Sequence, residues 1–270
     1  MALYPNNDPR NLFKLIHPSV DLVAAHTPHA HGLSLLCGRP LIVHRRTDIV
    51  PKHPWKYHRA QKIIAVSARI REILIATGLP PEKVVVVHSG VKSRAGGKNI
   101  LDFPRPIYGA IGALAAHKGH EIAIAALRQL PGSLVIAGEG EQRAFLMAEA
   151  RRLGVESRVF LLGQREDVSD LLASFDVFVH PSHSEGLGQV IAEALSAGSK
   201  VVASATGGIP EVVGTAGILV PPGHVDALAQ ALQQAIHLDP RIAIAQAQHF
   251  SAEAMARQTS AHYETLFANL

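Results

Sequence analysis

The chain has 270 residues, 47% of them hydrophobic and 18% charged, so it can bury a substantial core and does not have the composition of a disordered protein. Its formal net charge of +4 and aromatic content of 5% disfavour a nucleic-acid-binding surface, which interleaves basic and aromatic side chains. The single cysteine, Cys37, excludes an internal disulfide and fits a reducing compartment. No segment approaches the roughly 20 apolar residues of a membrane-spanning helix, and the polar N-terminus is unlike a signal peptide. We therefore expect a cytoplasmic protein, with the inner face of the membrane as an alternative location.

Apolar segments rich in β-branched residues alternate with helical patterns along the chain. The first four predicted strands are Asp21–Ala25, Pro40–His44, Lys62–Val66 and Lys83–His88. After a polar break, six more are predicted at Pro106–Ala110, Ser133–Ala137, Arg158–Leu162, Asp176–His180, Lys200–Ala203 and Gly217–Val220. The predicted helices are Ala68–Thr77, Gly119–Leu130, Glu141–Leu153, Gln189–Ala197, Val225–Ala235 and Ala252–Ala268. Because many of the strands are continuous apolar runs, as in parallel sheets covered on both faces, the pattern predicts a doubly wound α/β fold.

The polar break, KSRAGGKN at residues 92–99, contains a glycine pair and predicts an interdomain linker. It divides the chain into a first domain at 1–91, a second domain at 100–249 and a C-terminal helix at 250–270. The first domain is short, since an independent doubly wound domain usually takes on the order of 100–150 residues. We therefore expect this first, N-terminal domain to be partial.

The segment with the most chemistry is VHPSHSEGLGQVIAEALSAGSKVVASATGGIPE at residues 179–211. A predicted strand ends at His180, and a glycine-containing loop then opens a helix near Gln189, which is where parallel sheets bind ligands. Free backbone N–H groups and the helix dipole favour a phosphate there. Glu185 and Glu193, eight positions apart, can accept hydrogen bonds from sugar and ribose hydroxyls. Solvated glutamates and ordinary turn glycines are the alternative for each residue alone, but the combined spacing disfavours that alternative.

This segment resembles the donor-site signature of retaining glycosyltransferase family 4 (glycosyl transferases group 1), a Ser-Glu-Gly-x-Gly loop with a second glutamate eight residues after the first. Further stretches resemble the family in the right order: 63–91, 109–120 (GAIGALAAHKGH), 137–141 (AGEGE) and 160–168 (FLLGQREDV). The resemblance covers roughly residues 20–235. It implies a GT-B fold of two doubly wound, Rossmann-like domains, the N-terminal one incomplete.

The resemblance also implies roles for individual residues. Lys118 and Glu185 would be catalytic: Lys118 would pair with the diphosphate and stabilise charge on the leaving group, and Glu185 would hold the donor sugar. Glu193 would bind the ribose. The implied donor-binding set is Gly112, Lys118, Gly138, Gly163, Arg165, Glu185, Gly186, Leu187, Gly188 and Glu193. The base pocket would be lined by Gly138, Gly140, Gly163 and Arg165. The resemblance implies no cofactor, metal or covalent nucleophile, because the nucleotide-diphosphate sugar is itself the donor substrate.

Two features depart from the family pattern. Gly112 is followed by Ala113, where many members have an arginine that contacts phosphate. Lys118 must then neutralise more charge, with Arg165 or His117 as candidates to help it. The opening strand and glycine-rich loop of the N-terminal domain are also not found, so the acceptor side is expected to be incomplete.

The chain contains 16 histidines, which raises the question of metal binding. The two densest clusters are His26, His29, His31 and His180, His183. Neither lies with carboxylates or cysteines at metal-ligand spacing, so we expect cleft or surface histidines. His44, Arg45 and Arg46 follow a predicted strand where many relatives keep an acceptor-side histidine. The two arginines either hold an anionic acceptor or are solvated.

The leading hypothesis is a glycosyltransferase that moves a sugar from a nucleotide-diphosphate sugar to a glycan or lipid acceptor with retention, in cell-envelope polysaccharide or lipopolysaccharide synthesis. The alternative is a nucleotide-sugar-binding protein that is catalytically inactive or a truncated fragment. The expected partners are the donor and the acceptor, but no nucleic acid. Contact with a membrane surface and a partner subunit that completes the N-terminal domain are further alternatives.

Overall fold

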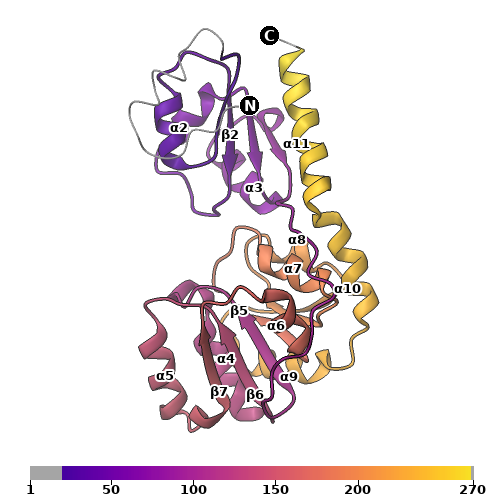
Figure 1. Ribbon diagram of the computed structural model, residues 1–270. Helices are drawn as coiled ribbons and strands as arrows, with labels where there is room; N and C mark the ends of the chain where they lie inside the picture. The colour runs from indigo at the N-terminus through magenta and orange to yellow at the C-terminus, as the bar shows by residue number, and fades with distance from the viewer. Residues whose placement is uncertain (1–19, 269–270) are drawn as a thin grey trace. The chain divides into compact units, whose positions relative to one another are not determined.

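The computed structural model describes residues 20–268, which form two compact α/β units (Figure 1). Unit 1 comprises residues 20–88 and 257–268, and unit 2 comprises residues 89–256. Each unit contains one sheet in which all strands are parallel, with helices packed on it. The predicted class, α/β with two Rossmann-like domains, is therefore confirmed. Within residues 20–268, no helix combines the length and apolar character needed to cross a membrane.

The sheet of unit 1 has the strand order β1-β2-β3-β4. Its strands are β1 (Val23–Ala25), β2 (Leu41–Arg45), β3 (Lys62–Ala65) and β4 (Val84–Val86). Its helices are α2 (Pro28–Ser34), α3 (Ala68–Ala76) and the C-terminal part of α11 (Ala252–Phe267). Helix α3 starts where the Ser67 hydroxyl accepts a hydrogen bond from the Ile70 N–H at 3.2 Å. It buries Ile70 and Leu74, which lie one turn apart on the same face.

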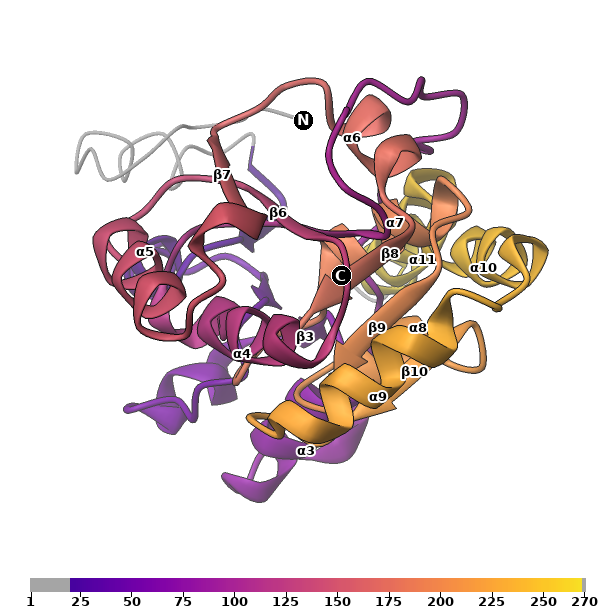
Figure 2. The same ribbon diagram turned by 90° about the horizontal axis from the view of Figure 1, so that it is seen from below.

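The sheet of unit 2 has the order β10-β9-β8-β5-β6-β7. Its strands are β5 (Ile107–Ile111), β6 (Ser133–Ala137), β7 (Val159–Gly163), β8 (Val177–His180), β9 (Val201–Ser204) and β10 (Gly217–Val220). Its helices are α4 (His120–Ala126), α5 (Arg143–Arg152), α6 (Val168–Ser174), α7 (Gln189–Ser196), α8 (Ile209–Val213), α9 (Val225–Ala235) and α10 (Pro240–Ala247). Helices α4, α5 and α9 cover one face of this sheet, and α6, α7 and α10 cover the other (Figure 2). All ten predicted strands are thus present, each within two residues of its expected start and end.

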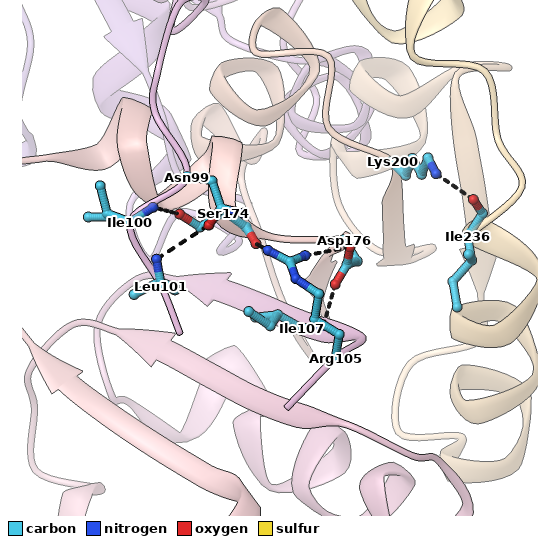
Figure 3. Close-up of polar contacts among 9 residues, drawn as sticks. All are labelled: Asn99, Ile100, Leu101, Arg105, Ile107, Ser174, Asp176, Lys200 and Ile236. Carbon is cyan, nitrogen blue, oxygen red and sulfur yellow. Dashed lines mark hydrogen bonds and ion pairs between the residues drawn. The ribbon is translucent and has the colours of Figure 1, made fainter. Parts of the chain in front are cut away.

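One carboxylate links the starts of β5 and β8, the two central strands of unit 2. The Asp176 carboxylate, just before β8, accepts hydrogen bonds from Arg105 Nη1 at 2.7 Å and from the Ile107 backbone N–H at 2.6 Å (Figure 3). Ile107 is the first residue of β5, so this contact connects the starts of β5 and β8. On the outer part of the same sheet, Lys200 donates to the Ile236 carbonyl at the end of α9, where a cation also interacts favourably with the helix dipole.

The segment 92–99, expected to be a linker, lies along unit 2. The Arg94 backbone N–H donates to Ser196 Oγ at 2.9 Å, and the Lys98 backbone N–H donates to Asp170 Oδ1 at 2.8 Å. The boundary between the units falls between residues 88 and 89, and α11 begins in unit 2 and ends in unit 1. The structure therefore divides the chain a few residues earlier than the sequence suggested, because these backbone groups bond to α6 and α7.

Four short helices, α2, α6, α8 and α10, were not among the predicted elements. Helix α2 contains histidines and a glycine, which gave no clear helical period. It begins because Thr27 Oγ1 accepts a hydrogen bond from the Ala30 N–H at 3.1 Å and Pro28 occupies the first turn.

Candidate functional site

The expected site residues all follow the carboxyl ends of parallel strands in unit 2, so they lie along one edge of its sheet. The chain runs from β5 outward to β6 and β7, and then returns to place β8 on the other side of β5. Strand order reverses at this point, and the crevice outside such a reversal is where open α/β sheets bind ligands. Lys118 follows β5 and Glu185 follows β8, so the two loops at the reversal carry the two residues expected to be catalytic.

The structure brings these two side chains into direct contact. Lys118 Nζ donates to Glu185 Oε2 at 2.5 Å, and the two side chains are only 17% and 18% exposed. His180 Nε2 lies 3.2 Å from the same carboxylate oxygen, and Ser182 Oγ lies 3.0 Å from His180 Nε2. An ionised carboxylate can only accept, so the His180 ring donates its Nε2 proton to Glu185.

The charge states follow from burial and these contacts. Burial raises the pKa of Glu185, but the hydrogen bonds from His180 and Lys118 outweigh it and lower that pKa to about 2. Burial lowers the pKa of His180 more than the bond to Glu185 raises it, so its ring is neutral near pH 7. The cluster therefore contains one anion, one cation and a neutral imidazole.

Two glycines allow the surrounding loops to approach this cluster closely. Gly119 has φ +64°, and a Cβ there would lie 2.1 Å from the Pro181 carbonyl oxygen. Gly207 has φ +56°, and a Cβ there would lie 1.6 Å from the Glu185 carbonyl oxygen. That carbonyl accepts a hydrogen bond from the Gly208 N–H at 3.3 Å. The ATGG loop after β9 therefore holds the backbone that carries Glu185.

The start of α7 supplies hydrogen-bond donors next to the Lys118–Glu185 pair. Gly188 is its N-cap residue, and Leu187 beside it is buried. Within residues 20–268, the backbone N–H groups of Gly186, Leu187 and Gly188 donate to no other residue. Free N–H groups at a helix N-terminus favour an anion.

Three glycines of the expected donor-binding set, Gly112, Gly138 and Gly163, lie side by side at the ends of β5, β6 and β7. The Gly112 N–H donates to the Ala137 carbonyl at 3.0 Å, and the Gly138 N–H donates to the Gly163 carbonyl at 2.8 Å. Arg165 is oriented differently: its guanidinium pairs with Asp167, two residues later, with Nε 2.8 Å from Oδ1. The base-pocket roles of Gly138, Gly140, Gly163 and Arg165 remain predictions.

Glu193 lies on the second turn of α7, and its Oε1 is 3.2 Å from Arg94 Nη2. Arg94 belongs to the segment 92–99, whose composition predicts a linker. Its contact with Glu193, the residue expected to bind the ribose, is therefore not predicted from the sequence. His180 was noted only as a cleft histidine, although its position five residues before Glu185 in the same motif could have indicated its role. The buried His120 was also missed: its Nε2 donates to the Ala113 carbonyl at 3.2 Å and so fixes the loop after β5.

Within the described part of the chain, no three histidine, cysteine, aspartate or glutamate side chains gather in a way that could hold a metal ion. That no metal or cofactor is required stays a prediction.

The candidate acceptor-side residues lie in unit 1. His44, at the end of β2, stacks on His26 with ring centroids 4.0 Å apart, and its Nε2 lies 2.9 Å from the Tyr263 hydroxyl of α11. Arg45 is buried and donates to the Tyr57 hydroxyl at 3.2 Å and to the Ile49 carbonyl. Arg45 is thus not solvated, and of the two arginines only Arg46 is exposed.

Comparison with known proteins agrees with this geometry. A family model described as "Glycosyl transferases group 1" matches residues 105–237, and one described as "Glycosyltransferase Family 4" matches residues 3–94. The lipopolysaccharide core biosynthesis glycosyltransferase LpsE of Rhizobium meliloti is 36% identical over 141 residues, which is 50% of this chain and 42% of LpsE. D-inositol 3-phosphate glycosyltransferase of Mycobacterium tuberculosis is 29% identical over 195 residues, or 65% of this chain and 41% of that protein. The chain therefore spans about two fifths of the length of these curated relatives.

Among solved structures, Anabaena Alr3699/HepE in complex with UDP superposes with a TM-score of 0.83 at 25% identity, covering 94% of this chain and 82% of that one. The same protein is also known in complex with UDP-glucose, with a TM-score of 0.79 at 26% identity. The lipopolysaccharide outer core galactosyltransferase WaaB, at 21% identity and a TM-score of 0.78, shares the fold. The two matched regions are similar to glycosyltransferases, and the two parallel α/β units have the GT-B fold of the superposed structures.

Proposed function

We propose that this chain is a glycosyltransferase whose unit 2 binds a nucleotide-diphosphate sugar and whose product retains the anomeric configuration of the donor. The observation that carries the proposal is the Lys118–Glu185 pair at the strand-order reversal of unit 2, beside the free N–H groups that begin α7. N–H groups that can bind a phosphate thus lie next to a carboxylate that can accept hydrogen bonds from sugar hydroxyls, as a nucleotide-diphosphate sugar requires.

The charges indicate how the donor is bound. Lys118 and Glu185 neutralise each other, so the pair has no net charge to offer the diphosphate. The backbone N–H groups at 186–188 and the dipole of α7 therefore supply much of the attraction. Lys118 has three N–H donors, so it can keep Glu185 and still donate to a phosphate oxygen. Glu185 in turn has a second oxygen for a sugar hydroxyl.

In the proposed reaction, the bond from the sugar C1 to the β-phosphate oxygen breaks, and the acceptor oxygen bonds to C1 on the same face. The acceptor proton passes to the leaving diphosphate, whose developing charge Lys118 stabilises. No residue of the cluster has to become a covalent nucleophile. Glu185 would orient the sugar, and His180 would orient Glu185 through its Nε2–H.

A uridine diphosphate sugar is the donor to test first, because the Anabaena relative is known with UDP and with UDP-glucose. We propose a glycan or lipid acceptor on the side of unit 1, in cell-envelope polysaccharide or lipopolysaccharide synthesis, as the LpsE relative suggests. Exposed apolar side chains in unit 1, among them Trp55 and Ile49, fit contact with a lipid surface.

The direct test is calorimetric titration of the purified chain with uridine, guanosine and adenosine diphosphates and their sugars. Saturable binding of one nucleotide, weakened in Glu193→Gln, supports the donor site. Release of free nucleotide diphosphate from the bound sugar nucleotide, with product stereochemistry read by NMR, then tests transfer with retention. Binding without turnover would favour a nucleotide-sugar-binding protein without transferase activity, and no binding would overturn the proposal.

A further inference from the structure

The segment before β5 is hydrogen-bonded to α7, the helix that directly follows the candidate donor loop. The Arg94 backbone N–H donates to Ser196 Oγ at 2.9 Å, and Arg94 Nη2 donates to Glu193 Oε1 at 3.2 Å. Ser196 Oγ itself donates to the Glu193 carbonyl at 2.7 Å. The backbone and the side chain of Arg94 therefore both contact one turn of α7, at residues that are 99 and 102 positions away in the sequence.

The surroundings of the Arg94–Glu193 ion pair indicate that it contributes little to the stability of the fold. The Arg94 and Glu193 side chains are 32% and 23% exposed, so solvent screens their attraction in part. The Arg94 Nε atom is buried and has no hydrogen-bond partner within the described residues, which is unfavourable. A pair with this geometry gains little for the fold, but it does fix the direction of the carboxylate.

That direction leaves one oxygen of Glu193 for a ligand. Oε1 accepts a hydrogen bond from Arg94, whereas Oε2 accepts none from any residue of 20–268. A ribose presents two neighbouring hydroxyls, and a carboxylate held by one oxygen can accept from them with the other. Fixing the carboxylate in advance avoids the entropy cost of ordering a free glutamate when the nucleotide binds.

The contact between Arg94 and Glu193 also reduces the electrostatic repulsion between Glu193 and a diphosphate. Two carboxylates, Glu185 and Glu193, face a ligand that carries a diphosphate, and each would repel it if it were left bare. Each of them has its own cation instead: Lys118 for Glu185 and Arg94 for Glu193. The two cations come from different parts of the chain, so each glutamate can be tested separately.

We propose that Arg94 is a positioning residue for ribose recognition: it orients and neutralises Glu193 so that the chain binds ribonucleotide donors in preference to deoxyribonucleotide ones. This inference rests on the proposed donor site in unit 2. Arg94 acts through Glu193 and does not itself touch the nucleotide.

The experiment compares the Kd of UDP with that of 2′,3′-dideoxy-UDP by calorimetry, using the intact chain and four variants. Arg94→Met removes the charge at similar length, Arg94→Lys keeps it, and Glu193→Gln removes the carboxylate. Arg151→Met is the matched control, because Arg151 pairs with Glu156 on the exposed side of unit 2 at 2.7 Å. Thermal unfolding of every variant shows whether the fold is kept.

We expect Arg94→Met to raise the Kd of UDP about tenfold, because one hydrogen bond to a charged group is lost. It should leave the affinity for dideoxy-UDP nearly unchanged, so that the preference for the ribonucleotide largely disappears. Arg94→Lys should restore most of that preference, and Arg151→Met should not alter it. If Arg94 acted only in folding, Arg94→Met would raise the Kd of both nucleotides by the same factor.

The outcomes separate the two proposals. If Glu193→Gln removes the ribose preference and Arg94→Met retains it, the role of Arg94 is wrong and the donor site stands. If Glu193→Gln also retains the preference, the ribose assignment itself is wrong. If neither nucleotide binds the unsubstituted chain, the proposed donor site fails and the inference fails with it.

Discussion

The two units carry different polar groups at the carboxyl ends of their parallel strands. In unit 2 the loops after β5 and β8 carry an ion pair, Lys118 with Glu185, and a second ion pair, Arg94 with Glu193, lies at the following helix α7. In unit 1 aromatic rings gather at the end of β2, next to the buried Arg45: His44, the second-last residue of β2, stacks on His26 and contacts Tyr263 of α11. Burial, with smaller contributions from His26 and Arg46, lowers the pKa of His44 to about 3, so this group is neutral near pH 7.

This difference fits the proposal that unit 2 binds the donor and unit 1 binds the acceptor. A diphosphate requires compensated charge and N–H donors, and those are gathered in unit 2. Neutral hydrogen-bonding rings suit the hydroxyl groups of an acceptor, and unit 1 offers the imidazole of His44 at the end of β2 and the phenol of Tyr263 on α11.

The largest expected effect is on turnover in Lys118→Ala. Loss of one cation that stabilises the leaving group typically lowers a rate by about 10²–10³-fold. Because the Glu185 carboxylate would remain ionised and unpaired beside the diphosphate, nucleotide affinity should fall as well. Turnover of a UDP-sugar and the Kd of UDP, measured on the same preparations, separate the two effects.

The double variant Lys118→Ala, Glu185→Gln is the informative control for that measurement. Removing both charges should restore nucleotide affinity in part while turnover stays low. By contrast, His44→Gln in unit 1 should leave the Kd of UDP unchanged. If His44→Gln weakens UDP as strongly as Lys118→Ala does, the division of charge between the units is wrong.

A second prediction concerns the stability of unit 2. Asp176 accepts hydrogen bonds from Arg105 and from the Ile107 backbone at the starts of the two central strands (Figure 3). Asp176→Ala should lower the free energy of unfolding by about 1–3 kcal/mol, because it leaves a backbone N–H without its partner. Urea unfolding at pH 7 measures the change. Asp226→Ala, which removes an exposed bond to Gln129, should cost less than about 0.5 kcal/mol.

The sequence predicted the strands well and the contacts between distant residues poorly. The ten strands are apolar runs bounded by polar loops, a local signal that the structure preserves. Helices such as α8, with five residues, carry no full helical period and depend on burial of Ile209 and Val212 against the rest of unit 2. Short-range patterns cannot reveal such helices.

The candidate site shows the same limit. The residues of the Ser-Glu-Gly-x-Gly loop could be named because they lie together in the sequence. The contact of Arg94 with Glu193 joins residues 99 positions apart, and the polar, glycine-containing composition of its segment suggested a linker instead. Only the fold shows that this segment lies along α7. The pairing of Lys118 with Glu185 likewise follows from the strand order, in which β8 is placed next to β5.

The third prediction uses pH to compare the units. A group whose pKa is lower in the folded state stabilises the protein fully above its unfolded pKa and loses this contribution as pH falls to the folded value. For His44 that range is from 6.5 down to about 3, and for Glu185 it is from 4.5 down to about 2. His44→Gln should therefore flatten the fall in the free energy of unfolding between about pH 6 and about pH 4.5.

Urea unfolding at several pH values measures this slope, with the exposed His58→Gln as a substitution control that leaves it unchanged. His120, whose pKa burial lowers to about 4, contributes over the same range from unit 2, so the slope should become shallower without disappearing. An unchanged slope in His44→Gln would show that the ring of His44 is not kept neutral by the fold.

The smallest expected effect tests whether unit 1 meets a lipid surface. Trp55, the single tryptophan of the chain, is 60% exposed, and Ile49 and Val50 are 68% and 61% exposed. Lys52 and Lys56 lie in the same segment, and exposed apolar side chains flanked by lysines favour anionic membranes. Phosphatidylglycerol vesicles should therefore shift the emission of Trp55 to shorter wavelength, whereas phosphatidylcholine vesicles should not.

Replacing Lys52 and Lys56 by glutamine should weaken this vesicle binding by about fivefold per lysine, from roughly 1 kcal/mol for each charge near the surface. Replacing Lys92 and Lys98, which are exposed in unit 2, by glutamine makes the same change in net charge and should leave binding unaffected. If both double variants weaken binding equally, net charge alone attracts the chain to the vesicle. In that case unit 1 makes no specific contact with lipid, and the difference between the units is limited to the ion pairs of the candidate donor site in unit 2.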